Sequence, residues 1–555
     1  MEIDLRRNGQ LTISQSKEIS LLEPEVRNEY NAFIGELAEK NNLSGLAWLL
    51  QATCRNTHLS LIHDSFCRIK LLKNILMRGE HIERVLVDSK SLMSICESIV
   101  HEYKSDAKVK LTGNARYGRL ILFRNIIKSA WLLLNIYVWP KVIRGKRVPN
   151  SPIIYLDNFI FIDSFDSKGE LNDRYYPGLI DGVISGDIKN KIWYVSTMIG
   201  IKTPKHFRSI FNSIRQSSQN IIVKEDWLTL GDYIYSFISS LILPLKIKKI
   251  PLWGNVNVDE LVVDELKIDR CSTSLNNSLL QYIFIKRLRK SGIDLDMVID
   301  WNENQTIDRA VNLAVKKYYP GVKVKGYQGY VVPDFYACKD PTCYELEAGT
   351  VPDEICVVGQ AFVENKKLNC RKLNINVVPA FRFLNIHKVK NTGYRDSNLI
   401  VIVLPISIDE CKEIIEISEK LTVLLGTEYR FIVKQHPTYT REKFQFLLPK
   451  AKNKVFTYTN ETTYELLKKC RLLVSASSSV CLEAAISGTP VAIIGSRSGP
   501  VKNPLANFDA LKAWKVCYSE LDIEHFLAET NHDINVPADN YFEPVTEDGL
   551  GKLLA

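Results

Sequence analysis

From residue 399 onward, short apolar runs rich in β-branched residues alternate with amphipathic segments, and this alternation constrains the fold most strongly. The runs lie within LIVIVLPIS, YRFIVKQHP, KVFTYTN, RLLVSA and TPVAIIGS. Strands that alternate with helices form parallel sheets, because a helical crossover returns the chain to the same edge. The pattern therefore predicts an α/β domain over residues 389–530.

The same alternation occupies the earlier part of the chain. Strand candidates include HIERVLVDS, PIIYLDNFIFIDSF, KIWYVSTMIG, DMVIDW and EICVVGQAF, with helical stretches between them. We expect an α/β domain over 81–388, with residues 1–80 as its helical beginning and 531–555 as a tail packing back on it. Two doubly wound Rossmann-like domains facing across a cleft form the GT-B architecture, in which ligands bind at the carboxyl ends of strands.

Composition limits the classes of function. With 555 residues, 46% hydrophobic residues and a net charge of +9, the chain resembles a soluble protein of several domains. No basic stripe carries interleaved aromatics, so nucleic acid is not an expected partner. No run of eighteen apolar residues predicts a spanning helix, and MEIDLRRNGQ lacks a signal-peptide core. The twelve scattered cysteines are expected to be reduced and mostly buried, in the cytoplasm.

One segment, residues 116–147, combines an apolar, aromatic middle with basic flanks. Trp131 and Trp139 lie in the middle, and eight lysines and arginines lie towards the two ends. Such a helix can lie in the interface of an anionic membrane, with its rings at headgroup depth. The alternative is a core helix with basic ends. We therefore expect either a peripheral contact with the inner membrane or ordinary packing.

A basic pair ends the apolar run FIVKQHP. Lys434 and His436 follow the strand, and Pro437 stops it. Such side chains can hold a phosphate and stabilise the charge of a departing one. Glu461 lies between this strand and the next, near a helix start, where it could bind ribose hydroxyls or simply complement the helix dipole.

Three serines follow the next strand in SASSSVCLEAAISGTP. Ser477, Ser478 and Ser479 precede a helix, where free N–H groups and short hydroxyls favour phosphate. Glu483, one turn into the helix, could cap it or reach a ligand hydroxyl. The alternative is an ordinary serine cap.

Together, K-x-H-P, an intervening Glu and paired serines resemble the nucleotide-binding half of bacterial GT-B transferases that use CMP-activated sugars. These include sialyltransferases and Kdo transferases. The resemblance implies that His436 and two of the three serines, best matched by Ser478 and Ser479, contact the CMP phosphate. It also implies that Glu461 binds ribose and that Lys434 lies beside the base.

The earlier half is similar to bacterial surface-carbohydrate biosynthesis proteins, in the blocks FIDSFDSKGELNDRYYPGLIDGV and IDWNENQTIDRAVNLAVKKYYPGVKVKGYQGYVVP. In GT-B transferases an acidic residue at a strand end of this domain serves as base or nucleophile. The candidates are Asp163, Asp166 and Glu303. Gln328 and Gln360 are expected to line the cleft.

The expected function is a metal-independent glycosyltransferase of capsule or lipopolysaccharide biosynthesis, without a cofactor. It would transfer a nonulosonic-type or Kdo-type sugar from a CMP-sugar to a glycan or lipid-linked glycan. The alternatives are a UDP-sugar or CDP-polyol donor, a nucleotide-sugar 2-epimerase, and a non-catalytic nucleotide-binding scaffold.

Overall fold

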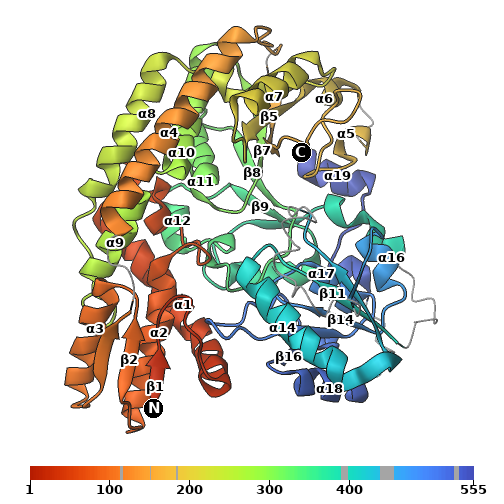
Figure 1. Cartoon of the computed structure of the whole chain (residues 1–555). Coiled ribbons are helices and arrows are strands. Elements are labelled where there is room, and N and C mark those ends of the chain that lie inside the picture. Colours follow the sequence, from red (N-terminus) through yellow and green to blue (C-terminus); the bar gives the residue numbers. More distant parts are fainter. Residues whose placement is uncertain (113–116, 151, 183–185, 389–397, 438–455, 531–536) are drawn as a thin grey trace.

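In the part of the chain that the structure describes, the apolar runs form three sheets, each built of parallel strands (Figure 1). The structure is a computed structural model that describes residues 1–112, 117–150, 152–182, 186–388, 398–437, 456–530 and 537–555. The boundaries expected at residues 389 and 531 fall on segments outside the described residues.

The first large sheet has seven strands in the order β10-β9-β8-β7-β4-β5-β6. The chain adds strands on one side from β4 to β6, then returns to place β7 beside β4 and builds outward to β10. The sheet is therefore doubly wound, and its direction switches between β4 and β7. Its strands are β4 (Ile153–Ile160), β5 (Ile192–Met198), β6 (Ile221–Val223), β7 (Leu295–Trp301), β8 (Lys323–Gln328), β9 (Glu354–Val357) and β10 (Ile375–Val377).

The second large sheet has six strands in the order β13-β12-β11-β14-β15-β16. It is wound in the same way, and its direction switches between β11 and β14. The expectation of two doubly wound α/β domains is confirmed by the two strand orders. The strands are β11 (Leu399–Val403), β12 (Arg430–Lys434), β13 (Phe456–Tyr458), β14 (Leu472–Ser475), β15 (Val491–Ile494) and β16 (Trp514–Cys517).

A third, smaller sheet lies at the N-terminus and corrects one expectation. The strand in HIERVLVDS was expected to begin the sheet of the first domain. Instead, β2 (Arg84–Val87) pairs with β1 (Glu2–Asp4) and β3 (Lys108–Leu111) in a separate sheet. The apolar side chains of this unit share one hydrophobic core with apolar residues of the segment 243–279.

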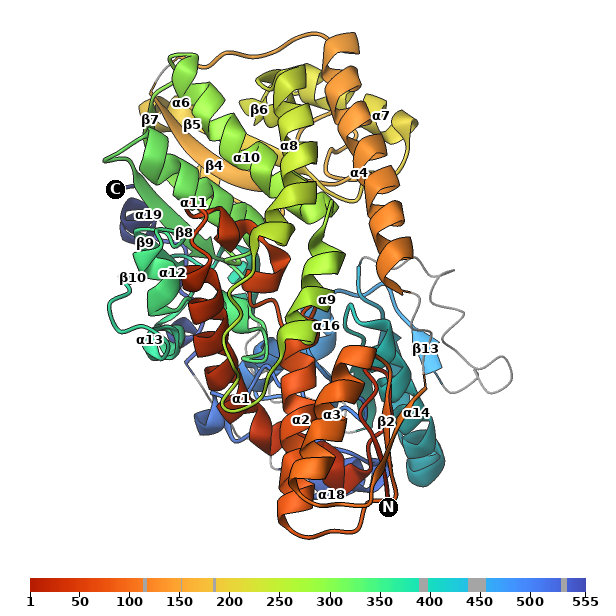
Figure 2. The ribbon, with the colours of Figure 1, turned by 90° about the vertical axis from the view of Figure 1, so that its left-hand side faces the viewer.

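Helices surround these sheets (Figures 1 and 2). The α-helices of the first 388 residues are α1 (Ile13–Lys40), α2 (Leu61–Met77), α3 (Lys90–Glu102), α4 (Tyr117–Val142), α5 (Leu179–Gly182), α6 (Gly186–Lys191), α7 (Pro204–Gln216), α8 (Leu230–Ile242), α9 (Asp259–Asp269), α10 (Thr273–Lys290), α11 (Thr306–Tyr318), α12 (Cys343–Glu347) and α13 (Val363–Lys367). Those that follow are α14 (Ile408–Leu425), α16 (Thr463–Leu467), α17 (Val480–Ile486), α18 (Glu520–Glu529) and α19 (Glu547–Leu554). Short 3₁₀ helices include η3 (Lys224–Asp226), η6 (Gln360–Phe362) and η7 (Phe381–Lys388).

The C-terminal segment lies against the first domain. The rings of Phe542 and Phe383 stack at 4.2 Å, and Lys325 on β8 donates to the carbonyl of Lys552 on α19 at 2.5 Å. Gly359 approaches the carbonyl of Tyr541 so closely that a Cβ atom would lie 2.2 Å from its oxygen. This position therefore requires glycine.

A buried ion cluster joins the N-terminal unit to the first large domain. Glu345 on α12 pairs with Arg55 at 2.6 Å and with Arg309 on α11, and all three side chains are buried. The remaining guanidinium protons reach backbone carbonyls, which include Ala337, Asp340, Thr53 and Cys54. Burial alone would raise the pKa of Glu345, but the two arginines hold it below its usual value.

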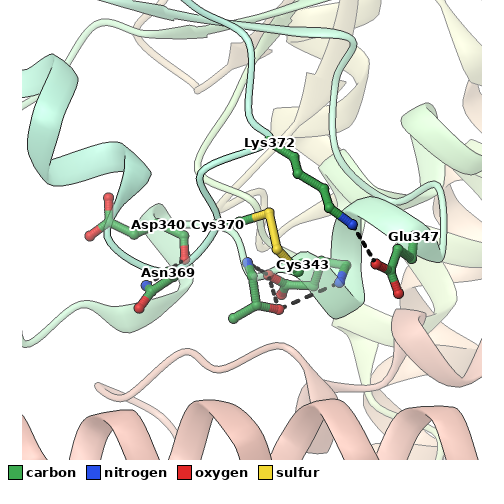
Figure 3. Close-up of a disulfide and its surroundings, with 8 residues drawn as sticks. Asp340, Cys343, Glu347, Asn369, Cys370 and Lys372 are labelled. Atoms are coloured by element: carbon green, nitrogen blue, oxygen red, sulfur yellow. Dashed lines mark hydrogen bonds and ion pairs between the residues drawn. A yellow bond between two sulfur atoms is a disulfide. The ribbon is translucent and has the colours of Figure 1, made fainter.

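A disulfide corrects the expectation that all cysteines are reduced. Cys343, at the start of α12, is bonded to Cys370, 27 residues later, with a Cα–Cα distance of 5.0 Å (Figure 3). The other ten cysteines are buried and form no disulfide in the described structure. Sequence spacing could not show this pair, because the chain between the two cysteines folds back through β9 and α13.

Replacement of Glu345 by Gln is expected to lower the free energy of unfolding by about 3–5 kcal/mol, because two buried arginines lose their counter-charge. Chemical denaturation measures this loss. Since the pKa of Glu345 is lowered in the fold, its contribution is complete above the ordinary value of 4.5 and is lost as pH falls below it.

The matched control is Glu347→Gln on the same helix. Glu347 pairs with Lys372 at 3.3 Å with both side chains largely exposed, so the loss should stay below about 1 kcal/mol. Equal losses in both variants would contradict the assigned role of Glu345.

Reduction of the disulfide, or Cys343→Ser, is expected to lower the free energy of unfolding by about 2–4 kcal/mol, because the unfolded chain regains the freedom of the closed loop. Denaturation with and without dithiothreitol measures the effect. A Cys411→Ser variant, which removes a free buried thiol, should keep its response to dithiothreitol. Insensitivity of the wild-type protein to the reductant would show that this bond does not stabilise the fold.

Candidate active site between the two large domains

The serine segment follows β14 at the point where the winding of the second sheet changes direction. Ser475, the last residue of β14, donates to the carbonyl of Val403, the last residue of β11, at 2.7 Å. The ends of these strands are therefore tied together, and the serines beyond them begin α17. In an open parallel sheet this is where ligands bind.

The three serines have different surroundings. The hydroxyl of Ser477 donates to Glu410, which also pairs with Lys502 at 2.8 Å. Ser477 is therefore engaged within the protein, which argues against its expected phosphate contact. Ser478 accepts from the N–H of Val480 at 3.4 Å, whereas Ser479 occupies the N-cap of α17 without a side-chain cap bond. Ser478 and Ser479 are partly exposed and remain the phosphate candidates.

Lys434 and His436 lie at the carboxyl end of β12, the neighbour of β11. Lys434 donates to the carbonyl of Glu461 at 2.5 Å, so its ammonium braces the next loop. Burial and the positive charge of Arg382 lower the pKa of His436. Without ligand, the lowered pKa favours the neutral imidazole of His436. Pro437 is exposed where the strand ends.

The two glutamates of the nucleotide prediction differ in exposure. Glu461 is partly exposed, precedes the N-cap of α16 and pairs with Lys469. It can therefore exchange this partner for a ribose. Glu483 is buried, and burial raises its pKa to about 7, although Tyr464 and Arg382 favour the carboxylate. Its hydrogen bond to Tyr464 is a structural tie between α17 and α16.

Arg382 on η7 is a site residue that the sequence analysis missed. Its guanidinium lies 5.6 Å from the ring centre of Trp301, the last residue of β7 in the first domain. Its charge also acts on His436 and Glu483 of the second domain. One exposed cation thus lies between the carboxyl ends of both sheets. A polar helical run, FRFLNIHK, shows no sequence pattern that would identify it.

A pocket of about 950 Å³ lies at the carboxyl edge of the first sheet, over the switch between β4 and β7. Its floor comes from the ends of β4, β5, β6 and β7, and α4 closes one side. The lining includes the aromatic residues Trp131, Phe159, Phe161, Tyr175, Phe207 and Trp301, the lysines Lys128, Lys202 and Lys224, and the acidic residues Glu225, Glu303 and Asp308.

Glu303 is the one sequence-predicted acid among those that line this pocket. It accepts from the indole of Trp301 at 3.2 Å and from Gln305 at 2.6 Å, which hold it at the end of β7. Asp163 is 66% exposed and pairs with Arg174 at 2.7 Å, while Asp166 accepts two N–H groups within its own turn. Neither contributes to the described lining of the pocket.

Glu225 is a further acid that the sequence analysis missed. It is buried in η3, burial raises its pKa, and its Oε2 atom has no hydrogen-bond partner. It follows β6, a strand of three residues that is too short to stand out in the sequence. The Nζ atom of the neighbouring Lys224 lies 3.8 Å from Oε1 of Glu225.

Three aspartates lie beneath the pocket. Burial and mutual repulsion raise the pKa values of Asp157 and Asp308, and burial raises that of Asp300 to about 6. Asp308 accepts the N–H groups of Glu303 and Gln305 at 3.0 and 2.9 Å. It therefore shapes the loop that carries Glu303.

The two glutamines of the cleft prediction lie apart. Gln328 is buried and donates to the carbonyl of Lys339 at 2.9 Å, beside a cavity of about 30 Å³. Gln360 is exposed at the start of η6. Of the two glutamines, only Gln328 is buried, and its hydrogen bond is to the protein backbone.

No family model and no curated protein matches this chain. Three solved structures illustrate its likeness in fold. The UDP-GlcNAc 2-epimerase from Methanocaldococcus jannaschii is 12% identical, with 72% of this chain and 98% of that one covered and a TM-score of 0.38. The epimerase from Neisseria meningitidis bound to UDP-GlcNAc has the same identity and coverage, with a TM-score of 0.36. The calicheamicin glycosyltransferase CalG4 is 9% identical, with 73% and 94% covered and a TM-score of 0.36. These low scores carry no argument about substrate.

Replacement of His436 by Gln is expected to raise the Kd for a nucleoside phosphate about 10- to 100-fold, through loss of a charge-assisted hydrogen bond. A bound phosphate favours the charged imidazole and raises the lowered pKa of His436. The wild-type protein should therefore bind more tightly as pH falls from 8 to 6, and calorimetric titration measures the difference from the variant.

The control is His387→Gln. His387 lies on η7 and faces Asp539 at 3.2 Å, so its loss should leave nucleotide affinity and its pH dependence unchanged. The same pH dependence in His436→Gln and in the wild-type protein would exclude His436 from the phosphate site.

Proposed function

We propose that this chain is a glycosyltransferase that takes a sugar from a nucleotide-activated donor. The donor's nucleotide would occupy the second domain at His436, Ser478 and Ser479, and the acceptor the 950 Å³ pocket of the first. The observation that carries this proposal is the pair of sheet switch points, with Arg382 between their carboxyl ends.

In the proposed reaction, an acceptor hydroxyl in the pocket attacks the anomeric carbon. The new bond joins that carbon to the acceptor oxygen, while the bond to the donor phosphate breaks. Glu303 receives the hydroxyl proton, and the phosphate leaves with the bonding electron pair. Arg382 and the Ser478–Ser479 segment face the charge that develops on the phosphate, and His436 donates to its oxygen.

The CMP-linked acidic sugar stays the first donor prediction, with a UDP-sugar or a CDP-polyol as the alternative. Arg382 suits either class, because its guanidinium can pair with the carboxylate of an acidic sugar or with a second phosphate. The role in capsule or lipopolysaccharide assembly and the cytoplasmic location are part of the same proposal. A disulfide is uncommon in that compartment.

A 2-epimerase is the second candidate, and one observation favours it. Such an enzyme needs several acids and bases around the sugar, and Glu225, Glu303 and Asp308 all line one pocket. A transferase is the better fit because a pocket of this volume leaves room for an acceptor beside the donor's sugar.

The first experiment is a thermal shift of the purified protein against CMP, CDP, UMP, UDP, GDP and ADP. At about a hundredfold excess over Kd, a bound nucleotide adds roughly 2.7 kcal/mol of stability. Response to CMP alone supports the CMP-sugar donor, and response to UDP supports the alternative. No response to any nucleotide would overturn the proposal, whereas a nucleotide response without turnover of the matching sugar donor would favour the nucleotide-binding scaffold. With the matching sugar donor, product analysis separates transfer from epimerisation, and EDTA should leave the rate unchanged.

Glu303→Gln is expected to lower kcat about 10²- to 10⁴-fold, because the attacking hydroxyl loses its base, while the thermal shift with nucleotide persists. Initial rates with the donor identified above measure this loss. Asp163→Asn is the matched control and should stay within a few-fold of the wild-type rate. A large loss in Glu225→Gln together with a near-normal Glu303→Gln would transfer the role of base to Glu225.

A further inference from the structure

Helix α4 presents a long apolar stripe to the outside. Large apolar side chains recur every three or four residues on one face and are between 36% and 66% exposed, namely Leu120, Phe123, Ile127, Trp131, Leu134, Val138 and Val142. A helix at the surface of a soluble protein normally buries such a stripe. A continuous exposed stripe of this length indicates an interaction surface.

Helix α8 runs beside α4 and contacts it (Figure 2). Its exposed apolar side chains are Leu230, Ile234, Tyr235, Ile238 and Ile242. We name these and the α4 side chains together the α4–α8 face. The two exposed apolar stripes thus lie on neighbouring helices.

Both helices bury polar residues behind this face. Ser236 and Ser240 of α8 are fully buried, and each hydrogen-bonds with Asn276 of α10, at 3.0 Å in both cases. Ser129 of α4 is also buried and donates to the carbonyl of Cys271 at 2.7 Å. Both helices thus bury polar side chains against the protein and expose apolar ones. This is the reverse of the pattern of a helix that faces water. The pattern indicates that the outer face meets an apolar medium.

The stretches that flank the face are mostly basic, although Asp232 on α8 and Asp259 and Glu260 on α9, which packs on α4, are acidic. The sequence between Asp106 and Asp157 holds no acidic residue, and neither does the stretch from Ile188 to Lys224, which contains α7. Exposed cations flank the face, namely Arg124 and Lys128 on α4, Lys202, Lys205 and Arg208 at α7, and Lys246, Lys248 and Lys249 after α8. Cations beside an apolar helix face complement anionic lipid headgroups.

Two other ways to cover the α4–α8 face, a membrane-spanning helix and a dimer interface, fit less well. Among the described helices, the segment Leu120–Val142 is long and apolar enough to cross a membrane. No spanning helix was expected from the sequence, because it contains no uninterrupted run of eighteen apolar residues. The inner side of this helix, however, is bonded to the protein, since Asn125 donates to the carbonyl of Ile268 at 2.8 Å and Ser129 to Cys271. In a symmetric dimer the same basic rim would face itself. A bilayer surface avoids both conflicts.

The same face borders the pocket of the first domain. Ile127 and Trp131 belong to the exposed stripe and also line the pocket. We propose that the α4–α8 face docks on an anionic bilayer, so that the pocket opens at headgroup depth and receives an acceptor carried by a lipid. The acceptor class rests on the proposed function, whereas docking does not.

The test is flotation of the full chain with vesicles of phosphatidylcholine, with and without phosphatidylglycerol. The wild-type protein should float with the anionic vesicles and bind at least about tenfold less to neutral ones or in high salt. A face variant, Phe123→Ser with Leu134→Ser, Ile234→Ser and Ile238→Ser, should lose at least tenfold in binding. It leaves the pocket-lining residues unchanged.

A matched control, Leu21→Ser with Val423→Ser, removes apolar side chains that are 81% and 80% exposed elsewhere and should float as the wild type does. Nucleotide thermal shifts should be the same in all variants, which shows that they are folded. Docking would be overturned if the wild-type protein did not float, or if the face variant floated equally well. It would also be overturned if the wild-type protein were a dimer and the face variant a monomer. Flotation without any nucleotide response would overturn the proposed function and leave docking in place.

Discussion

The buried cluster of Arg55, Glu345 and Arg309 is the interaction on which the arrangement of the first half depends. It joins three segments that are far apart in sequence, and its guanidinium groups also hold the backbone of residues 53 and 54. Removing three charges from water is costly, so the cluster is stable only with every donor satisfied. This requirement specifies one position for the N-terminal unit against α11 and α12. The disulfide from Cys343 ties the same short helix to the loop after α13.

The site follows from the way both large sheets are wound. At each switch point the helices depart to opposite faces and leave the carboxyl ends of two central strands uncovered. In the second sheet these ends carry the serines and lie beside His436, and in the first they carry Trp301 and Glu303. Arg382 lies between them, on a segment that belongs to neither sheet. Arg382 is therefore a cation within electrostatic reach of both sheet ends.

Sequence reasoning placed polar residues at strand ends more readily in the second domain than in the first. Lys434 ends the apolar strand β12, and His436 and the serines follow apolar strands, so their position at a strand end could be predicted. In the first domain Asp163 also follows a strand, yet its loop turns outward to Arg174, while Glu303 turns inward under the restraint of Asp308. Glu225 was missed because β6 has three residues, and the sequence could not show that the hydroxyl of Ser477 donates to Glu410, which is distant in sequence.

The sequence by itself determined the local and periodic features of the fold. The spacing of apolar residues, the lengths of the runs and the residues that end them specify parallel α/β domains and place polar groups at strand ends. Only the tertiary structure decided which of these groups meet, because that depends on long-range contacts such as Arg382 with Trp301 and Ser477 with Glu410. It also decided that β2 joins a separate sheet and that α4 and α8 turn their apolar sides outward. In each case the choice depends on a partner that is distant in sequence, and periodicity within one segment carries no information about that partner.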